Sequence, residues 1–289
     1  MSTANNGWIS YGNGEFQPSQ DLSIPVMDDF LGVIRGIRVF TTTVTAGNVF
    51  FHLNDHVQRV VDAAKTLRIP LSESPEEIAK HCQDCLDKSR AAGQEGPGAM
   101  CLIASGGDGN SPGRIYVLLK DFKPFEQRLY TEGARLESFA FQRYIPLVKL
   151  THYLGGHMAK ESQNPDTDFT FFVTPEGQVL EGDTFSLFFI SGQKIITPPV
   201  SDGILDGITR RLVCRLIQDR LPYELEERHV QADEIPNMDE AFLTSSLRRV
   251  MPIHCMDGHT FDSPGAVSTA VRNAVQHYYS QYPSETLSL

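Results

Sequence analysis

The sequence predicts an α/β protein with two parts, a first in which strands and helices alternate and a second that is rich in strands. In the first part, the β-branched run "IRVFTTTV", the turn "AGN" and the run "VFFHL" predict a hairpin over residues 37–53. In the second part, short runs such as "DFTFFVT", "QVLEG" and "FSLFFIS" are separated by the turns "PEG" and "GQ". This spacing indicates a barrel or a highly curved sheet.

Two helices and two strands are expected after the hairpin. In "NDHVQRVVDAAKTLRI", with Asn54 or Asp55 as the cap, apolar residues recur at helical spacing. The segment "SPEEIAKHCQDCLDKSRAAG" carries a capping box from Ser74 to Glu77, Pro75 at the first helical position and Gly93 beyond the end. The strands "AMCLIAS" and "RIYVLLK" close the first part near residue 122.

Residues 123–140 show no periodicity and are interpreted as a connector into the second part. There the run "KIITPP" is a further expected strand. The segments "GITRRLVCRLIQDRL" and "PGAVSTAVRNAVQHYYSQY" are amphipathic and predict helices.

Composition excludes several classes of function. A formal net charge of -11 over 289 residues argues against a nucleic-acid or anionic-membrane partner, because phosphate binding needs clustered Lys and Arg. The first residues, "MSTANNGWISYGNGEF", lack the features of a signal peptide, and no apolar run approaches the roughly 18 residues of a membrane span. We therefore expect a soluble, cytoplasmic enzyme.

The five cysteines, at 82, 85, 101, 214 and 255, are interpreted as reduced thiols, because their number is odd and their spacing fits no disulfide framework. The pair in "HCQDC" lies in a helical pattern, and no second pair supplies the ligands of a structural zinc. The sequence therefore predicts no metal site.

A few polar residues outside these patterns could together bind one ligand. Lys149 follows an apolar run, and Glu181 stands where a strand meets a glycine turn. Gly207, Ile208 and Thr209 open a helix, whose first backbone N–H groups form an anion site. Arg59 offers a guanidinium, and "FLTSSLRRV" at residues 242–250 offers hydroxyls. A lysine, a carboxylate and phosphate donors are what pyridoxal phosphate requires, although each alone also fits a solvated lysine, a turn or a cap.

The order and spacing of these motifs resemble those of the class IV, fold type IV pyridoxal-phosphate aminotransferases, a family that includes branched-chain and D-amino-acid aminotransferases and aminodeoxychorismate lyase. The similar segments are "GWISYGNGEFQP", "FHLNDHVQRVVDAAKTLRI", "KLTHYLGGHMAKES", "VLEGDTFSLFFI", "TPPVSDGILDGITRRLV" and "FLTSSLRRVMPI". The resemblance runs over nearly the whole chain.

The resemblance implies a role for each matching residue. Lys149 takes the place of the Schiff-base lysine, Tyr153 that of a tyrosine near the cofactor ring, and Glu181 that of the glutamate paired with the pyridine nitrogen. The implied phosphate ligands are Arg59, Gly207, Ile208, Thr209 and Ser246. Lys160, the rival lysine, is interpreted as structural.

The resemblance also implies the architecture and the assembly. It implies a small α/β domain over residues 1–122, a connector at 123–133 and a larger pseudo-barrel domain over 134–289 that carries Lys149. The implied assembly is a homodimer, and the implied mechanism is transamination in two half-reactions.

Positions that select the substrate depart from the commoner family patterns. Arg35 stands in place of an active-site tyrosine and Thr41 in place of a glutamate, and Phe40 is a further candidate substrate contact. Ser105 replaces a carboxylate-binding arginine of the usual D-enzymes, and Ser186 replaces an asparagine beside the cofactor. Arg35 either binds a substrate carboxylate or forms an ion pair with one of the chain's many carboxylates.

Arg248 and Arg249 stand where small residues line the carboxylate site of branched-chain enzymes, and Arg248 is the candidate substrate ligand. Three functions remain open. They are an aminotransferase for branched-chain L-amino acids or, in an unusual form, for D-amino acids, a lyase such as aminodeoxychorismate lyase, and a cofactor-binding protein without turnover.

Overall fold

The chain forms two compact units in a computed structural model that describes residues 7–282. Of the described residues, the first unit comprises 7–123, Val148–His152 and 279–282. The second comprises Pro124–Leu147 and Tyr153–Tyr278. The outer limits expected for the two domains, in residues 1–6 and 283–289, lie outside the described residues.

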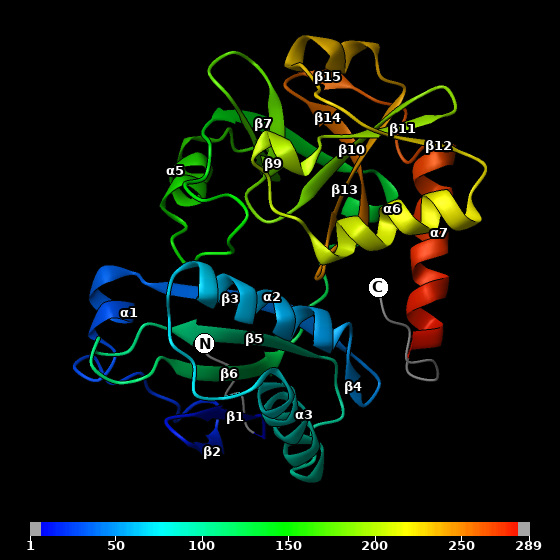
Figure 1. Cartoon of the computed structure of the whole chain (residues 1–289). Helices are drawn as coiled ribbons and strands as arrows, with labels where there is room; N and C mark the ends of the chain where they lie inside the picture. Colours follow the sequence, from blue (N-terminus) through cyan, green and yellow to red (C-terminus); the bar gives the residue numbers. More distant parts are fainter. Residues whose placement is uncertain (1–6, 283–289) are drawn as a thin grey trace. The chain divides into compact units, whose positions relative to one another are not determined.

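The first unit is built on a six-stranded sheet with the order β2-β1-β6-β5-β3-β4 (Figure 1). Its strands are β1 Ile9–Gly12, β2 Glu15–Pro18, β3 Arg38–Ala46, β4 Val49–Phe50, β5 Gly98–Ser105 and β6 Arg114–Asp121. Neighbouring strands pair antiparallel throughout. The predicted hairpin at 37–53 is present as β3 and β4, and the two strands expected before residue 122 are β5 and β6.

The helices of this unit are α1 Phe30–Arg35, α2 Leu53–Thr66 and α3 Pro75–Ala91. Helix α2 packs on β3 and β5, and α3 packs on β1 and β6. The burial of side chains alternates along the first part of β3. Val39, Thr41 and Thr43 are buried, whereas Arg38, Phe40 and Thr42 are only partly buried. The face of β3 that carries Arg38 and Phe40 is therefore the one turned away from α2.

Val148–His152 extends this sheet at β3, although it comes late in the sequence. The Phe40 N–H donates to the Lys149 carbonyl at 2.9 Å, and the Thr151 N–H donates to the Arg38 carbonyl at 3.2 Å. Val39 and Leu150 form an antiparallel bridge between these bonds. The sequence assigns Lys149 to the second domain, whereas these main-chain hydrogen bonds place it in the first unit.

The second unit is built on a nine-stranded sheet. Its order is β12-β11-β10-β13-β14-β7-β8-β9, with β15 paired to β14. The strands are β7 Ala134–Ala140, β8 Phe169–Val173, β9 Val179–Gly182, β10 Ser186–Ser191, β11 Lys194–Thr197, β12 Glu224–Glu227, β13 Glu240–Ser245, β14 Arg249–Met256 and β15 His259–Thr260.

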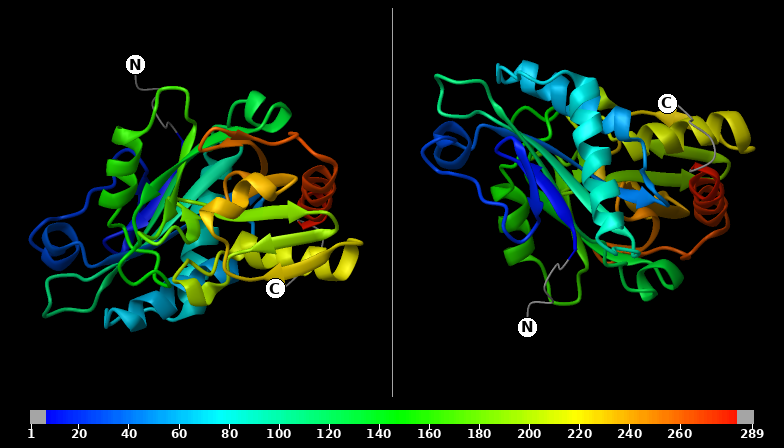
Figure 2. Two further views of the ribbon diagram at one scale, coloured as in Figure 1. Left: turned by 90° about the horizontal axis from the view of Figure 1, so that it is seen from above. Right: turned by 90° about the horizontal axis from the view of Figure 1, so that it is seen from below.

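Helices and a buried apolar cluster complete the second unit. The helices are α4 Arg128–Thr131, α5 Leu154–Ser162, α6 Ile208–Arg220 and α7 Ala266–Gln281, with 3-10 turns η1 Val200–Asp202 and η2 Ala232–Asn237. Helix α6, drawn in yellow, lies along the sheet and contacts β12 and β13 (Figure 2). Phe171, Phe189 and Leu243 are completely buried in the core beneath these strands.

Two local predictions differ from the structure. The sequence predicts a cap for α2 at Asn54 or Asp55, whereas the helix begins at Leu53 with His52 as the cap residue in the left-handed region (φ 52°). The prediction is wrong because the hairpin leads directly into the helix and leaves Asp55 in its first turn, where its carboxylate contacts His52 Nδ1 at 2.8 Å. The stretch at 123–140 interpreted as a connector contains α4 and the whole of β7.

The other short-range predictions are confirmed. The capping box of α3 is present, with Pro75 at the start of the helix and Gly93 at positive φ after its end. Cys82 and Cys85 of "HCQDC" are fully buried on α3. Within residues 7–282, no helix is both long and apolar enough to cross a membrane.

Replacement of Ser74 by Ala will test the contribution of the capping box. The Glu77 N–H donates to Ser74 Oγ at 3.2 Å, and the Ser74 N–H donates to Glu77 Oε2 at 2.8 Å. Removal of the hydroxyl should lower the free energy of unfolding by about 1 kcal/mol, measured by urea denaturation. The control is Ser72→Ala, which removes an exposed hydroxyl that contacts only Glu73. Equal effects of the two substitutions would contradict the role of the box.

Candidate active site

Lys149 lies half-buried on the face of the first unit's sheet that is turned away from α2. Its Nζ is 4.8 Å from the ring centroid of Phe40, a distance typical of a cation–π contact. Burial raises the pKa of the neighbouring Cys101 thiol to about 11, and the ammonium of Lys149 opposes this rise. By contrast, Lys160 is exposed on α5. The tertiary structure thus distinguishes the two lysines as the sequence motif does.

Arg59 projects from α2 and is held by Thr41, which the sequence analysis placed where relatives have a glutamate, and by His56, which it did not single out. Its Nη2 donates to the hydroxyl of Thr41, and Thr41 Oγ1 lies 2.5 Å from Nδ1 of His56. Thr41 and His56 are completely buried. The available signals were the three-residue spacing of His56 and Arg59 on one helix and the inward position of Thr41 on β3. Together, Thr41 and His56 orient the guanidinium of Arg59.

Glu181 lies at the end of β9 with only 6% of its surface exposed. Nε and Nη2 of Arg143 contact its Oε1 at 2.8 and 2.7 Å. The N–H of Leu205 donates to both carboxylate oxygens at 3.2 Å. These donors compensate for burial of the carboxylate charge. Sequence reasoning missed Arg143, because nothing local links it to a residue 38 positions away.

The predicted phosphate ligands of the second unit come together at the start of α6. Gly207 is the cap residue and has no side-chain capping hydrogen bond, and Ile208 and Thr209 follow it in the first turn. Thr209 Oγ1 lies 3.5 Å from Ser246 Oγ, in the turn after β13. A Cβ on residue 207 would lie 3.2 Å from the Ser186 hydroxyl. Two hydroxyls and the first N–H groups of a helix suit an anion.

Arg248 occupies the turn between β13 and β14. Its guanidinium lies over the rings of Phe125, Phe169 and Phe185, at 4.8, 4.5 and 5.6 Å from their centroids, and Nη1 donates to Thr184 Oγ1 at 3.0 Å. Burial lowers the pKa of this guanidinium, and nearby Asp183, Tyr130 and Tyr153 oppose that effect. The aromatic rings hold the cation in place.

The other predicted site residues lie at the ends of helices. Tyr153 is the residue that precedes α5. Arg35 is the last residue of α1, exposed to solvent and followed by Gly36 in the left-handed region. Within the first unit the structure thus groups Lys149 with Phe40, and within the second it groups the phosphate ligands around the start of α6.

Replacement of Arg143 by Met will test whether its guanidinium compensates the buried charge of the Glu181 carboxylate. The variant leaves a buried carboxylate without its guanidinium, and we expect the free energy of unfolding of the apoprotein to fall by about 2 kcal/mol. The double variant with Glu181→Gln should recover part of this loss, since the uncompensated charge is gone. Lys194→Met, which removes a lysine about half exposed beside Glu224 and Glu226, is the control. Additive losses in the double variant would contradict the pairing.

Several known proteins are similar to this chain over most of its length. The chain is 27% identical over 270 residues to a putative branched-chain-amino-acid aminotransferase of Methanocaldococcus jannaschii, covering 88% of this chain and 89% of the relative. It is also 27% identical to the aminodeoxychorismate lyase of Bacillus subtilis, over 90% of both chains. The D-alanine aminotransferase of Bacillus licheniformis is 27% identical over 85% of this chain and 87% of its own.

The fold has solved counterparts. The branched-chain amino acid aminotransferase of Thermobaculum terrenum, solved in its PLP form, superposes with a TM-score of 0.84 at 23% identity, covering 96% of this chain and 95% of that one. The sequence profile of the family Amino-transferase class IV matches residues 38–255. The chain therefore belongs to the class IV aminotransferases and is a pyridoxal-phosphate-dependent transaminase of the α/β fold type IV.

Proposed function

We propose that this protein moves an amino group between an amino acid and a 2-oxo acid in two half-reactions, with Lys149 as the catalytic residue. The preferred amino acid in this proposal is a branched-chain L-amino acid or, alternatively, a D-amino acid. The position of the Lys149 amine beside the Phe40 ring carries the proposal. A half-buried lysine whose amine is held beside an aromatic ring is a strong candidate for covalent bonding to an aldehyde, because the ring fixes the position of the amine.

The residues present fit pyridoxal phosphate. An amine is needed for the aldehyde, a carboxylate for the pyridine nitrogen and several donors for the phosphate, and the chain offers Lys149, Glu181 and the start of α6. When bound, the cofactor supplies a ring that withdraws the electron pair left at the substrate Cα. We assign the phosphate to Arg59, Gly207, Ile208, Thr209 and Ser246, and the ring surroundings to Tyr153.

Lys149 has two tasks in this proposal. It would hold the cofactor until an amino acid takes its place, and its released amine would then accept the proton from the substrate Cα as a base and return it as an acid. Glu181 accepts a hydrogen bond from the protonated pyridine nitrogen, because an anionic partner favours that protonation. Arg143 fixes the Glu181 carboxylate in place for this task.

We propose Phe40, Arg35 and Arg248 as contacts of the substrate. Phe40 has the most direct support, since its ring already lies against the reactive amine. Arg35 is exposed at the end of α1, and its side chain can approach a substrate carboxylate from solvent. Arg248 is a partly buried cation compensated by rings and a hydroxyl, and a carboxylate would pair with it more strongly than these groups do.

A lyase reaction is the second candidate. The match to an aminodeoxychorismate lyase, at the same identity as the match to the aminotransferase, favours it. A lyase would use Lys149 and the same cofactor to eliminate pyruvate from a ring acid. Pyruvate release from aminodeoxychorismate in the absence of any 2-oxo acid acceptor identifies this reaction, and its absence removes the lyase.

The assembly and compartment belong to the same proposal. We propose a cytoplasmic homodimer, in line with the family resemblance. All five cysteines are free thiols, which is typical of a reducing compartment. Light scattering on the purified protein measures the assembly, and a fully active monomer would contradict it.

Replacement of Lys149 by Ala should abolish the visible absorption band that pyridoxal phosphate gives when it is bound to the protein, because the amine that bonds the aldehyde is gone. Lys160→Ala, which removes the exposed lysine of α5, should keep the band. Titration of the wild type with a panel of L- and D-amino acids should then convert the band to that of the pyridoxamine form with the true donor. Retention of the wild-type band in Lys149→Ala would assign the aldehyde to another amine.

Replacement of Thr209 by Val or of Ser246 by Ala should weaken binding of pyridoxal phosphate. A hydroxyl that donates to a charged phosphate contributes about 1.5–3 kcal/mol, so each variant should raise the dissociation constant by about tenfold or more. Fluorescence titration of the apoprotein measures this constant. Thr131→Val, an exposed threonine on α4, is the matched control. Wild-type affinity in both variants would place the phosphate elsewhere.

A further inference from the structure

Arg38 lies on the same face of β3 as the proposed catalytic lysine. Arg38 and Phe40 are two residues apart on the strand, so their side chains point to the same side. Phe40 is opposite Lys149 and Arg38 is opposite Thr151, which makes Lys149 and Arg38 diagonal neighbours. Such neighbours have Cβ atoms about 7–8 Å apart, a separation that one small organic acid can span.

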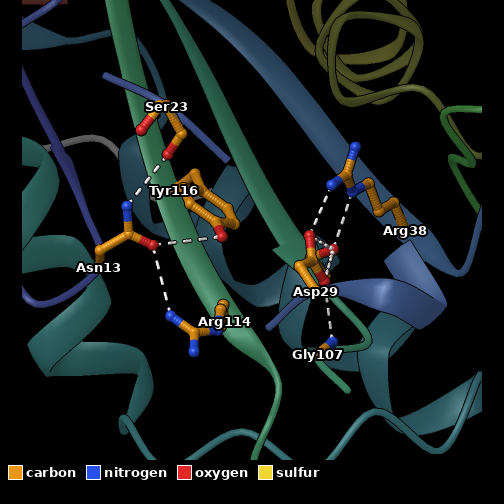
Figure 3. A network of polar contacts seen from close by, with 8 residues as sticks. Asn13, Ser23, Asp29, Arg38, Gly107, Arg114 and Tyr116 are labelled. Carbon is orange, nitrogen blue, oxygen red and sulfur yellow. Dashed lines mark hydrogen bonds and ion pairs between the residues drawn. The ribbon is translucent and has the colours of Figure 1, made fainter. Parts of the chain in front are cut away.

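The guanidinium of Arg38 is fixed by a buried network (Figure 3). Nη2 donates to Asp29 Oδ2 at 2.5 Å, and Nε donates to Ser105 Oγ at 2.8 Å. Asp29 is completely buried and also accepts from the Ser105 hydroxyl at 2.7 Å and from the Gly107 N–H at 2.9 Å. A cation held by groups on different segments loses little further freedom when it binds a ligand.

Gly32 on α1 is necessary for this network. A Cβ at this position would lie 1.9 Å from Ser105 Oγ, 2.5 Å from Asp29 Oδ1 and 2.8 Å from Arg38 Nε. Any other residue would push the three groups apart. The packing of α1 thus leaves room for an arginine that lies flat against β5.

The network uses only one edge of the guanidinium. Nε and Nη2 form the side-on fork that contacts Ser105 and Asp29. Nη1 points away from Asp29 in Figure 3, and within residues 7–282 no group accepts a hydrogen bond from it. Arg38 keeps 16% of its side chain exposed, whereas its partner Asp29 keeps none. The end-on fork of Nη1 and Nη2 therefore remains open to a second carboxylate.

We propose that Arg38 binds a carboxylate of the amino acid or 2-oxo acid substrate through this open fork. Asp29 and Ser105 are positioning residues that aim the guanidinium. The inference rests on the proposed function, since it needs Lys149 to be the residue at which the substrate reacts. If Arg38 served only to balance the charge of Asp29, the contacts of Nε and Nη2 would be sufficient. No substrate carboxylate would then bind at Nη1.

The test is a comparison of acid and amide binding to the cofactor-loaded protein. The probes are 4-methylvalerate, its uncharged amide and the dicarboxylate glutarate, and the readout is the dissociation constant from calorimetry. Arg38→Gln should weaken binding of 4-methylvalerate by about tenfold or more, the effect of a lost charge-assisted pair, and leave the amide unchanged. Arg114→Gln on β6, opposite Ser105, is the matched control.

The two acids distinguish whether Arg38 binds the carboxylate next to the reacting carbon or a carboxylate on the substrate side chain. Weaker binding of both acids means that Arg38 holds the carboxylate next to the reacting carbon, which both share. Weaker binding of glutarate alone means that Arg38 holds a carboxylate on the substrate side chain. Equal affinity of wild type and variant for both acids overturns the inference.

A second variant covers the case in which Arg38→Gln does not fold. The double variant Arg38→Gln with Asp29→Asn removes both charges, so no buried carboxylate is left without a cation. It should show the same loss of acid binding, and wild-type affinity in it overturns the inference. A wild type without the visible band of bound pyridoxal phosphate would instead overturn the proposed function, so the two failures are distinguishable.

Discussion

The main-chain pairing of residues 149–151 with β3 is the constraint on which the proposed site depends. Two hydrogen bonds and one bridge tie a late segment of the chain to the first unit's sheet. Because side chains alternate along a strand, this register places the Lys149 amine on the face of Phe40 and Arg38. A slip of one residue would turn Lys149 toward the opposite face, where α2 packs. The register of this pairing therefore decides on which face of the sheet the amine of the proposed catalytic lysine lies.

Three charged side chains that are buried or partly buried, Asp29, Glu181 and Arg248, are compensated in different ways. Asp29 is surrounded by a guanidinium, a hydroxyl and a main-chain N–H. Glu181 is held by Arg143 and the Leu205 N–H. Arg248 lies among aromatic rings, and burial moves its pKa below the usual value. Each charge is oriented by these partners before any ligand arrives, as binding of charged substrates requires.

Some features of the fold could be predicted from the sequence because they depend on residues that are close together in the chain. The capping box of α3 needs only Ser74 and Glu77, three residues apart, and the hairpin of β3 and β4 needs only two apolar runs around a turn. The start of α6 was readable for the same reason. By contrast, the cap of α2 at His52 was missed because the turn out of β4, and not the helix sequence, decides where that helix begins. Strand β7 was missed because its pairing with β14 and β8 cannot be seen in a segment without periodicity.

The sequence by itself determined the family and the cofactor and predicted the groups proposed to bind it, because these depend on residue types at fixed spacings along the chain. The tertiary structure decided which groups meet. Arg143 reaches Glu181 across 38 positions, and Thr41 lies 15 positions from His56 where both hold Arg59. Asp29 and Ser105, which together hold Arg38, are 76 positions apart. Hydrogen bonds between distant segments depend on packing and strand register, and one sequence shows neither of these directly.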